Sequence, residues 1–280
     1  MSRSSLWTDF ECRKMNADKT RVYLERSRSS SINLRLDEGG DLSPHNPFLQ
    51  IVPLAIGRLK SLIVNATPRN LPPITAHLSQ PSPLLGLLST NGNYESKIEH
   101  NPVLTTALFN EDLPSLRELR LQSVRTELPW RNMVNLTSFE LGRTSPDHVP
   151  IRQLLDFFES APRLHNIRLF FATPSSGAQN GRLVSLACLK WMHVAGEGPP
   201  SLVLDHLIIP AGAELTTRTK SHGPPIDNLL PKSLNNLGNL SNFTKIHLDF
   251  SDFYPHTIQR TERASSYVYV SPGRPHPLDA

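Results

Sequence analysis

The chain has 280 residues, including 42 Leu, 25 Pro and 14 Gly, a profile typical of short repeated elements in a chain long enough to bury a core. The net charge is only +4, with no block of like charge, which gives no support to nucleic-acid binding. No apolar stretch is long enough for a signal peptide or a membrane span. Cys12 and Cys188 cannot form a disulfide framework, so we expect a reducing, cytoplasmic or nuclear location.

The pattern L-x-x-L-x-L, with apolar substitutes allowed, recurs along the chain. Clear copies begin at Leu59, Leu116, Leu136, Leu164, Leu189 and Phe243, and weaker copies begin at Leu84 and Leu204. Successive copies start 15 to 39 residues apart, and most of these intervals are close to the roughly 20 to 29 residues of leucine-rich repeats.

In each copy the last two apolar residues are two apart, so a short strand turns both to one face. A strand this short cannot bury that face alone, but parallel stacking of the copies under intervening helices makes a continuous core. We therefore predict an α/β leucine-rich-repeat solenoid, with a curved parallel sheet on the concave side and helices and loops on the convex side.

The connections between copies contain both helical and loop signals. Residues 151–158 carry apolar side chains at helical spacing, with Asp147 as a possible cap and Ala161-Pro162 as the end. Residues 102–112 and 229–240 look like the same element. Residues rich in Gly, Pro, Ser or Thr predict loops at 39–47, 173–181 and 211–225.

Several segments between residues 6 and 250 share motifs with one known family. They are Leu6–Phe10, Lys19–Ser27, Ser31–Asp37, Leu113–Leu121, Leu128–Arg131, Met133–Leu141 and Gln153–Arg163. They resemble the leucine-rich region that follows the F-box in a large class of fungal F-box proteins. The resemblance implies a substrate receptor, in which the F-box docks on a cullin-RING ubiquitin ligase through its adaptor and the repeats hold the target.

The resemblance also implies a division of the chain. Residues 1–30 are expected to be a remnant of the post-F-box segment or an N-terminal cap, and residues 31–250 the leucine-rich-repeat-like domain. Residues 251–280 are expected to be a C-terminal strand, at the sheet edge near Tyr267–Val270, and a loose tail. We expect the F-box itself to be missing from this chain, so that the adaptor binds only if an F-box is supplied upstream.

Strand alternation places a mixed row of charged and aromatic side chains on the predicted concave face. The candidate partner-binding residues are Glu118, Arg120, Glu140, Asn166, Arg168, Phe170, Trp191, His193, Lys245 and His247. Arg and Trp are enriched at interface hot spots. Three interpretations stay open: a surface for a target protein, a solvated face whose charges pair between strands, and a site for a small ligand.

Catalytic patterns are weak. His193, His206 and His247 would approach one another only if their strands were neighbours, and no carboxylate or cysteine completes a metal site. Cys188 lies in an apolar run and is expected in the core. Neither a G-x-S-x-G elbow nor a P-loop occurs.

We therefore predict a protein-protein recognition module that is not an enzyme, resembling the substrate-binding region of an F-box subunit. Its partner is a target protein on the concave face, with no cofactor, metal, nucleic acid or membrane. The alternative is a stand-alone leucine-rich-repeat scaffold or decoy that recruits no ligase.

Overall fold

The chain forms two compact units, Met1–Ser145 (unit 1) and Pro146–Ala280 (unit 2). A computed structural model describes residues 8–11, 17–38, 47–67, 69–92, 103–104, 108–126, 133–143, 149–170, 181–196, 199–219, 230–237, 243–249 and 266–272. For residues 243–249 and 266–272 the description covers the backbone. The domain boundaries at residues 30 and 250 stay predictions.

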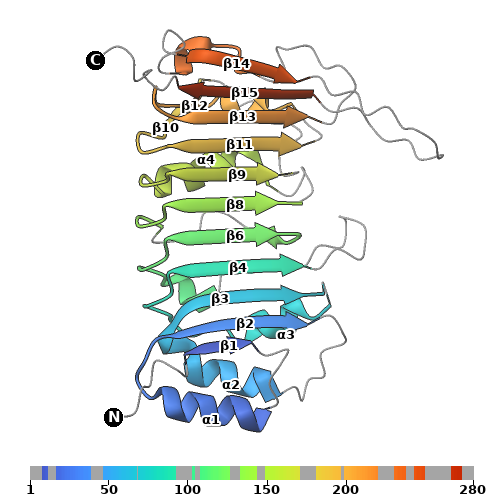
Figure 1. Ribbon diagram of the computed structural model, residues 1–280, viewed down its shortest axis with the longest axis vertical. Coiled ribbons are helices and arrows are strands. Elements are labelled where there is room, and N and C mark those ends of the chain that lie inside the picture. Colours follow the sequence, from blue (N-terminus) through green and yellow to red (C-terminus); the bar gives the residue numbers. More distant parts are fainter. Residues whose placement is uncertain are drawn as a thin grey trace, which may run out of the picture. The chain divides into compact units, whose positions relative to one another are not determined.

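In the described part of unit 1, six parallel strands lie in chain order, each hydrogen-bonded to the next (Figure 1). They are β1 (Asp9–Glu11), β2 (Ile32–Glu38), β3 (Leu59–Ala66), β4 (Leu87–Gly92), β6 (Glu118–Gln122) and β8 (Ser138–Gly142). Buried apolar residues pair directly from strand to strand: Phe10, Leu34, Leu62, Leu88, Leu119 and Phe139. This stacked row is the core that the repeated leucines predict.

The weak copy assigned to Leu84 is displaced by one residue. Leu85 is fully buried, whereas Leu84 is 49% exposed. The pattern is weak because Thr90 takes the last apolar position, between Val64 and Leu121 of the neighbouring strands. The Thr90 hydroxyl is buried with no hydrogen-bond partner among the described residues. Because a threonine occupies a position usually taken by leucine, the sequence pattern did not show that this repeat begins at Leu85.

In the described part of unit 2, three parallel strands lie side by side in the main sheet: β9 (Asn166–Phe170), β11 (Trp191–Gly196) and β13 (Glu214–Thr219). Next to β13 lies β15 (Ser266–Pro272), which is antiparallel, and β14 (Phe243–Asp249) pairs with the far side of β15. The C-terminal strand near Tyr267–Val270 therefore exists, but it lies between β13 and β14, and its predicted place at the sheet edge was wrong. Two neighbours satisfy its backbone groups on both sides, which an edge position would not do.

The prediction that the weak copy at Leu204 contributes a strand to this sheet was also wrong. Its strand, β12 (Leu207–Ile208), pairs with β10 (Val184–Ser185) in a separate small sheet. The strand beside β11 is instead β13, within the segment 211–225 that was predicted as a loop. Thr217 there occupies the position next to Val194, and its buried hydroxyl has no partner among the described residues. The missing leucine again concealed a strand.

The helix predicted over 151–158 is confirmed as α4 (Ile151–Ser160), with C-cap Ala161. Its N-cap is Pro150, with no side-chain cap, and Asp147 lies outside the described residues. The side chains that α4 buries are Ile151, Leu154, Leu155, Phe157 and Phe158.

The other two predicted helices were wrong. Residues 102–112 contain β5 (Val103–Leu104) and a 3₁₀ turn, η5 (Leu108–Glu111), in which Phe109 and Asn110 both have φ of 54°. That left-handed backbone interrupts an α-helix. Residues 229–240 contain, in their described part, the 3₁₀ turn η8 (Leu234–Asn236). Pro231 disfavours an α-helical backbone at Leu230, which a helix over this segment would need.

Short elements complete the described connections. They are α1 (Ala17–Ser27), α2 (Pro47–Ala55), η3 (Ile56–Arg58), α3 (Leu71–Ala76), β7 (Arg125–Thr126), which pairs with β5, and α5 (Ser201–Leu204). Phe10 of β1 makes an edge-to-face ring contact with Tyr23 of α1, at a centroid distance of 6.0 Å. The residues predicted as an N-terminal cap thus contribute an edge strand and a helix to unit 1.

Both units therefore repeat one arrangement: a short parallel strand, stacked leucines and a turn or helix leading to the next strand. The chain is an α/β leucine-rich-repeat solenoid, as the sequence predicted. No helix in the described part of the chain is long and apolar enough to cross a membrane.

Candidate protein interface

In each unit, the strands of the main sheet have a polar face, which we define as the face carrying the side chains that alternate with the buried apolar residues. In β6, Leu119 and Leu121 are buried while Arg120 between them is exposed, and β9 alternates in the same way around Ile167 and Leu169. The predicted residues on the unit 1 face are Glu118, Arg120 and Glu140, and those on the unit 2 face are Asn166, Arg168, Phe170, Trp191 and His193. Lys245 and His247 belong to β14, whose side chains lie outside the description.

The polar face of unit 1 is acidic and internally paired. Its described carboxylates outnumber its arginines, with Asp9, Glu11, Asp37, Glu118 and Glu140 against Arg35 and Arg120. Each arginine bonds a carboxylate two residues away on its own strand: Arg35 to Asp37 at 2.7 Å and Arg120 to Glu118 at 2.6 Å. The hydrogen bond to Asp37 and its charge raise the pKa of Arg35. These ion pairs form within one strand, whereas the alternative left open by the sequence was a solvated face whose charges pair between strands.

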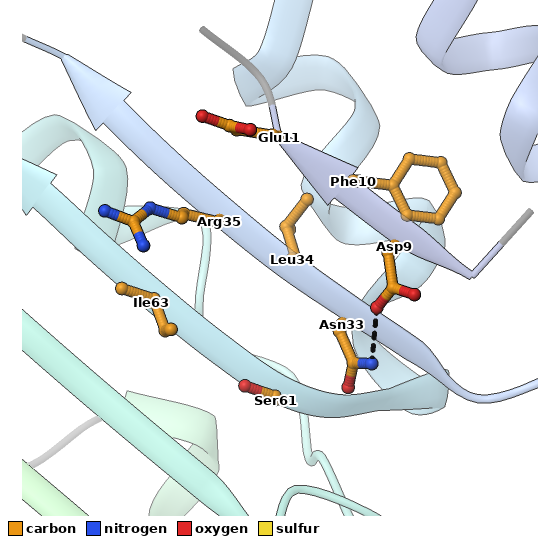
Figure 2. A pocket seen from close by; sticks show the side chains of 8 residues that line it. All are labelled: Asp9, Phe10, Glu11, Asn33, Leu34, Arg35, Ser61 and Ile63. Atoms are coloured by element: carbon orange, nitrogen blue, oxygen red, sulfur yellow. Dashed lines mark hydrogen bonds between the residues drawn. The ribbon is translucent and has the colours of Figure 1, made fainter. Parts of the chain in front are cut away.

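A cavity of about 280 Å³ lies on this face at the end formed by β1, β2 and β3. Figure 2 shows Glu11, Arg35 and Ile63 on the three neighbouring strands, where they are in register, and the hydrogen bond of 2.7 Å from the Asn33 amide to Asp9. The cavity is slightly smaller than the roughly 300 to 1,000 Å³ of drug-sized ligand sites. Its mixed lining favours no particular small ligand.

The polar face of unit 2 differs because aromatic rings lie among its charges. We call Arg168, Phe170, Trp191, His193 and Arg218 the aromatic-arginine patch. The Trp191 and His193 rings stack with an interplanar angle of 8° and a centroid distance of 5.9 Å. The Arg168 guanidinium lies over the Phe170 ring, 5.7 Å from its centroid. The side chains of Trp191 and Phe170 are half-buried, so each is packed against a neighbour and still accessible to a partner.

His193 lies at the centre of this patch. Its strand β11 has β9 on one side, where Arg168 is its register partner, and β13 on the other, where the charged residues are Glu214 and Arg218. Burial, and then the charges of Arg168 and Arg218, lower the pKa of His193 below its usual 6.5. The folded protein therefore favours the neutral imidazole.

This lowered pKa predicts a pH dependence of stability. Since the unfolded chain protonates His193 near pH 6.5 and the folded chain only at lower pH, the free energy of unfolding falls as pH drops through about 6.5 toward the folded pKa. Above that range the penalty is absent. We expect His193→Gln to have a shallower decline than the original protein between about pH 7.5 and 5.5, measured by urea denaturation. Parallel declines in the two proteins would contradict the prediction.

The strands of His193, His206 and His247 are not neighbours, so the three histidines do not approach one another. In register order, Thr216 of β13 and Tyr269 of β15 separate His193 from His247. Three strand spacings of about 4.8 Å put their backbones roughly 14 Å apart, too far for a shared metal. His206 precedes β12 of the other small sheet, and its Nδ1 lies 3.0 Å from the Arg182 carbonyl. Among the described residues, no group of three or more His, Cys, Asp or Glu could hold a metal ion.

Sequence reasoning missed Arg218, because its strand was assigned to a loop. The three threonines among Glu214-Leu-Thr-Thr-Arg-Thr219 were the available signal, since β-branched residues are enriched in strands. Cys188 was wrongly expected in the core and is exposed. It occupies a turn that the Leu189 amide closes by donating to the Leu186 carbonyl at 2.9 Å, which leaves the two turn residues outside.

No family model and no curated protein matches the chain. Among solved structures, the crystal structure of Listeria monocytogenes InlP aligns with 96% of this chain and 80% of that chain, at 13% sequence identity and a TM-score of 0.27. A likeness of that size carries no argument, so the fold assignment depends on the strand register. These comparisons give the F-box resemblance no support.

Proposed function

We propose that the polar face of unit 2 is a protein-recognition surface, centred on the aromatic-arginine patch. The observation that carries this proposal is the half-buried Trp191, stacked on His193, whose register partner Arg168 lies over the Phe170 ring. Trp and Arg are the residue types most enriched at interface hot spots, since one offers rigid apolar area and the other a planar fork of donors. Solenoids generally present the strand face as an extended binding surface.

The packing of the patch supports the proposal further. Because Trp191 and Phe170 already contact neighbouring side chains, a partner does not have to immobilise freely rotating rings. In unit 1, by contrast, Arg35 and Arg120 bond carboxylates of their own strands. The two faces therefore offer a partner different chemistry, and unit 2 offers the apolar area that hot spots require.

Substitution of Trp191 tests the proposal. The immobilised full chain is used to capture proteins from lysate of the cells that express it, and Trp191→Ala should lose the captured partner or weaken its binding about 30-fold or more, as expected for a hot spot of at least about 2 kcal/mol. Leu183→Ala is the matched control, because Leu183 is also apolar and 45% exposed but precedes β10, off this sheet. Equal binding by Trp191→Ala and the original protein would contradict the proposal.

The resemblance to fungal F-box proteins supports a finer proposal, in which the captured protein is a target for a ubiquitin ligase. Its test is co-purification of the ligase adaptor with the full-length product of the gene. Capture of a partner without any adaptor would favour the stand-alone scaffold or decoy.

A further inference from the structure

We infer that the aromatic-arginine patch accepts an acidic peptide segment of the partner protein. This inference rests on the proposed recognition function and specifies the chemistry of what is recognised. Three observations carry it: the charge of the unit 2 face, the position of its two arginines, and the aromatic side chains beside them.

The charge of the face favours an anionic segment. On the described strands β9, β11 and β13, the polar-face charges are Arg168 and Arg218 against Glu214. Both Arg168 and Arg218 lower the pKa of His193, so their positive charge is felt at the centre of the patch.

The arginines lie on the two strands that flank β11. Arg168 of β9 is level with His193, and Arg218 of β13 is level with Ala195. Two strand spacings and an offset of two residues separate their backbones by about 12 Å, and side chains four residues apart on one side of an extended peptide are about 13.6 Å apart. A single extended segment that crosses the strands diagonally can therefore bring one carboxylate to each guanidinium. Guanidinium groups bind carboxylates through paired, charge-assisted hydrogen bonds.

The side chains beside the arginines suit the body of such a segment. Phe170 lies two residues from Arg168 on β9, and Trp191 lies two residues from His193 on β11; both are half-buried and present apolar area. Ala195, between Phe170 and Arg218, is small and buried. Aromatic residues and Arg are both enriched at protein interfaces. The carboxylates would set orientation and association rate, and the aromatic contact would add affinity.

Fluorescence anisotropy with labelled peptides tests the inference on the full chain. The probes are three peptides of equal length with alternating Glu-Ser, Gln-Ser or Lys-Ser sequences. We expect the Glu-Ser peptide to bind at least about tenfold more tightly than the other two, and this preference to shrink as salt screens the charges. Equal or tighter binding of the Lys-Ser peptide would overturn the inference.

Charge-removing variants separate the patch from the net charge of the chain. Arg168→Gln and Arg218→Gln should each weaken Glu-Ser binding about tenfold or more, because each removes one charge-assisted contact. The matched control is Arg152→Gln, which removes the same charge from an exposed position on α4. If Arg152→Gln weakens binding as much as the patch variants, the patch is not the site and the inference fails.

The two proposals fail in different ways. If the Glu-Ser peptide does not bind while Trp191→Ala still loses its captured partner, the recognition function stands and the acidic segment is wrong. If the peptide binds through Arg168 and Arg218 but Trp191→Ala retains every captured protein, the acidic preference stands and the recognition role of Trp191 is wrong.

Discussion

Phe158→Ala is expected to lower the free energy of unfolding by about 3 to 5 kcal/mol, measured by urea denaturation. Phe158 is 1% exposed, and its ring lies 6.0 Å from the ring of Phe157, which is also fully buried. The truncation removes an aromatic ring from close-packed surroundings and leaves a cavity that the rigid helix cannot collapse to fill. Both the lost burial and the cavity contribute to the cost.

Arg152→Ala on the same helix is the matched control. Arg152 is exposed on α4, and Ala is the best helix former, so its stability change should stay within about 0.5 kcal/mol. A similar effect of both substitutions would mean that α4 does not bury the face assigned to it. Near-UV circular dichroism of Phe158→Ala would show whether the variant stays folded at low denaturant.

Leu85→Ala is expected to cost about 2 to 5 kcal/mol, as for other fully buried leucines. Leu85 stands at the first apolar position of its repeat, and the adjacent Gly86 amide donates to the Lys60 carbonyl at 2.8 Å, which ties this turn to the preceding repeat. The side chain cannot move away from the gap that its truncation would leave, because the turn on which it stands is held by that bond. The readout is again the midpoint and slope of urea denaturation.

The neighbouring Leu84→Ala makes a sharp control, because it is the same chemical change one residue away. Leu84 is 49% exposed, so its removal should change stability by no more than about 0.5 kcal/mol. The two substitutions together also test whether the repeat begins at Leu84 or at Leu85. A large cost at Leu84 together with a small cost at Leu85 would restore the frame first predicted from the sequence and contradict the structure.

Much of the fold follows from spaced leucines, and two of the exceptions have a common cause. Strands that keep leucine at the last core position, such as β6 and β8, were predicted from the pattern. The strands β4 and β13 carry Thr90 and Thr217 at that position, and these two strands were misplaced or missed. A threonine is compatible with a strand and with a turn, so its burial depends on the strands beside it.

In the candidate site, too, some residues were predictable from the sequence pattern and others depend on which strands pair. Arg168, Phe170, Trp191 and His193 were predicted from alternation within two clear copies, and the structure places them on one face. Arg218 was missed, because its position beside Ala195 depends on the pairing of β13 with β11. The place of β14 was also beyond prediction, since β15 inserts before it by long-range antiparallel pairing that no local pattern specifies.

Local periodicity was thus enough to establish a stacked α/β solenoid and to indicate which side chains face away from its core. Which strands are neighbours, and so which charges and rings share one patch, was settled by hydrogen-bond register between segments distant in the chain. The reason is physical: alternation depends on the geometry of one strand, whereas a neighbour is chosen by the combined packing and backbone pairing of two.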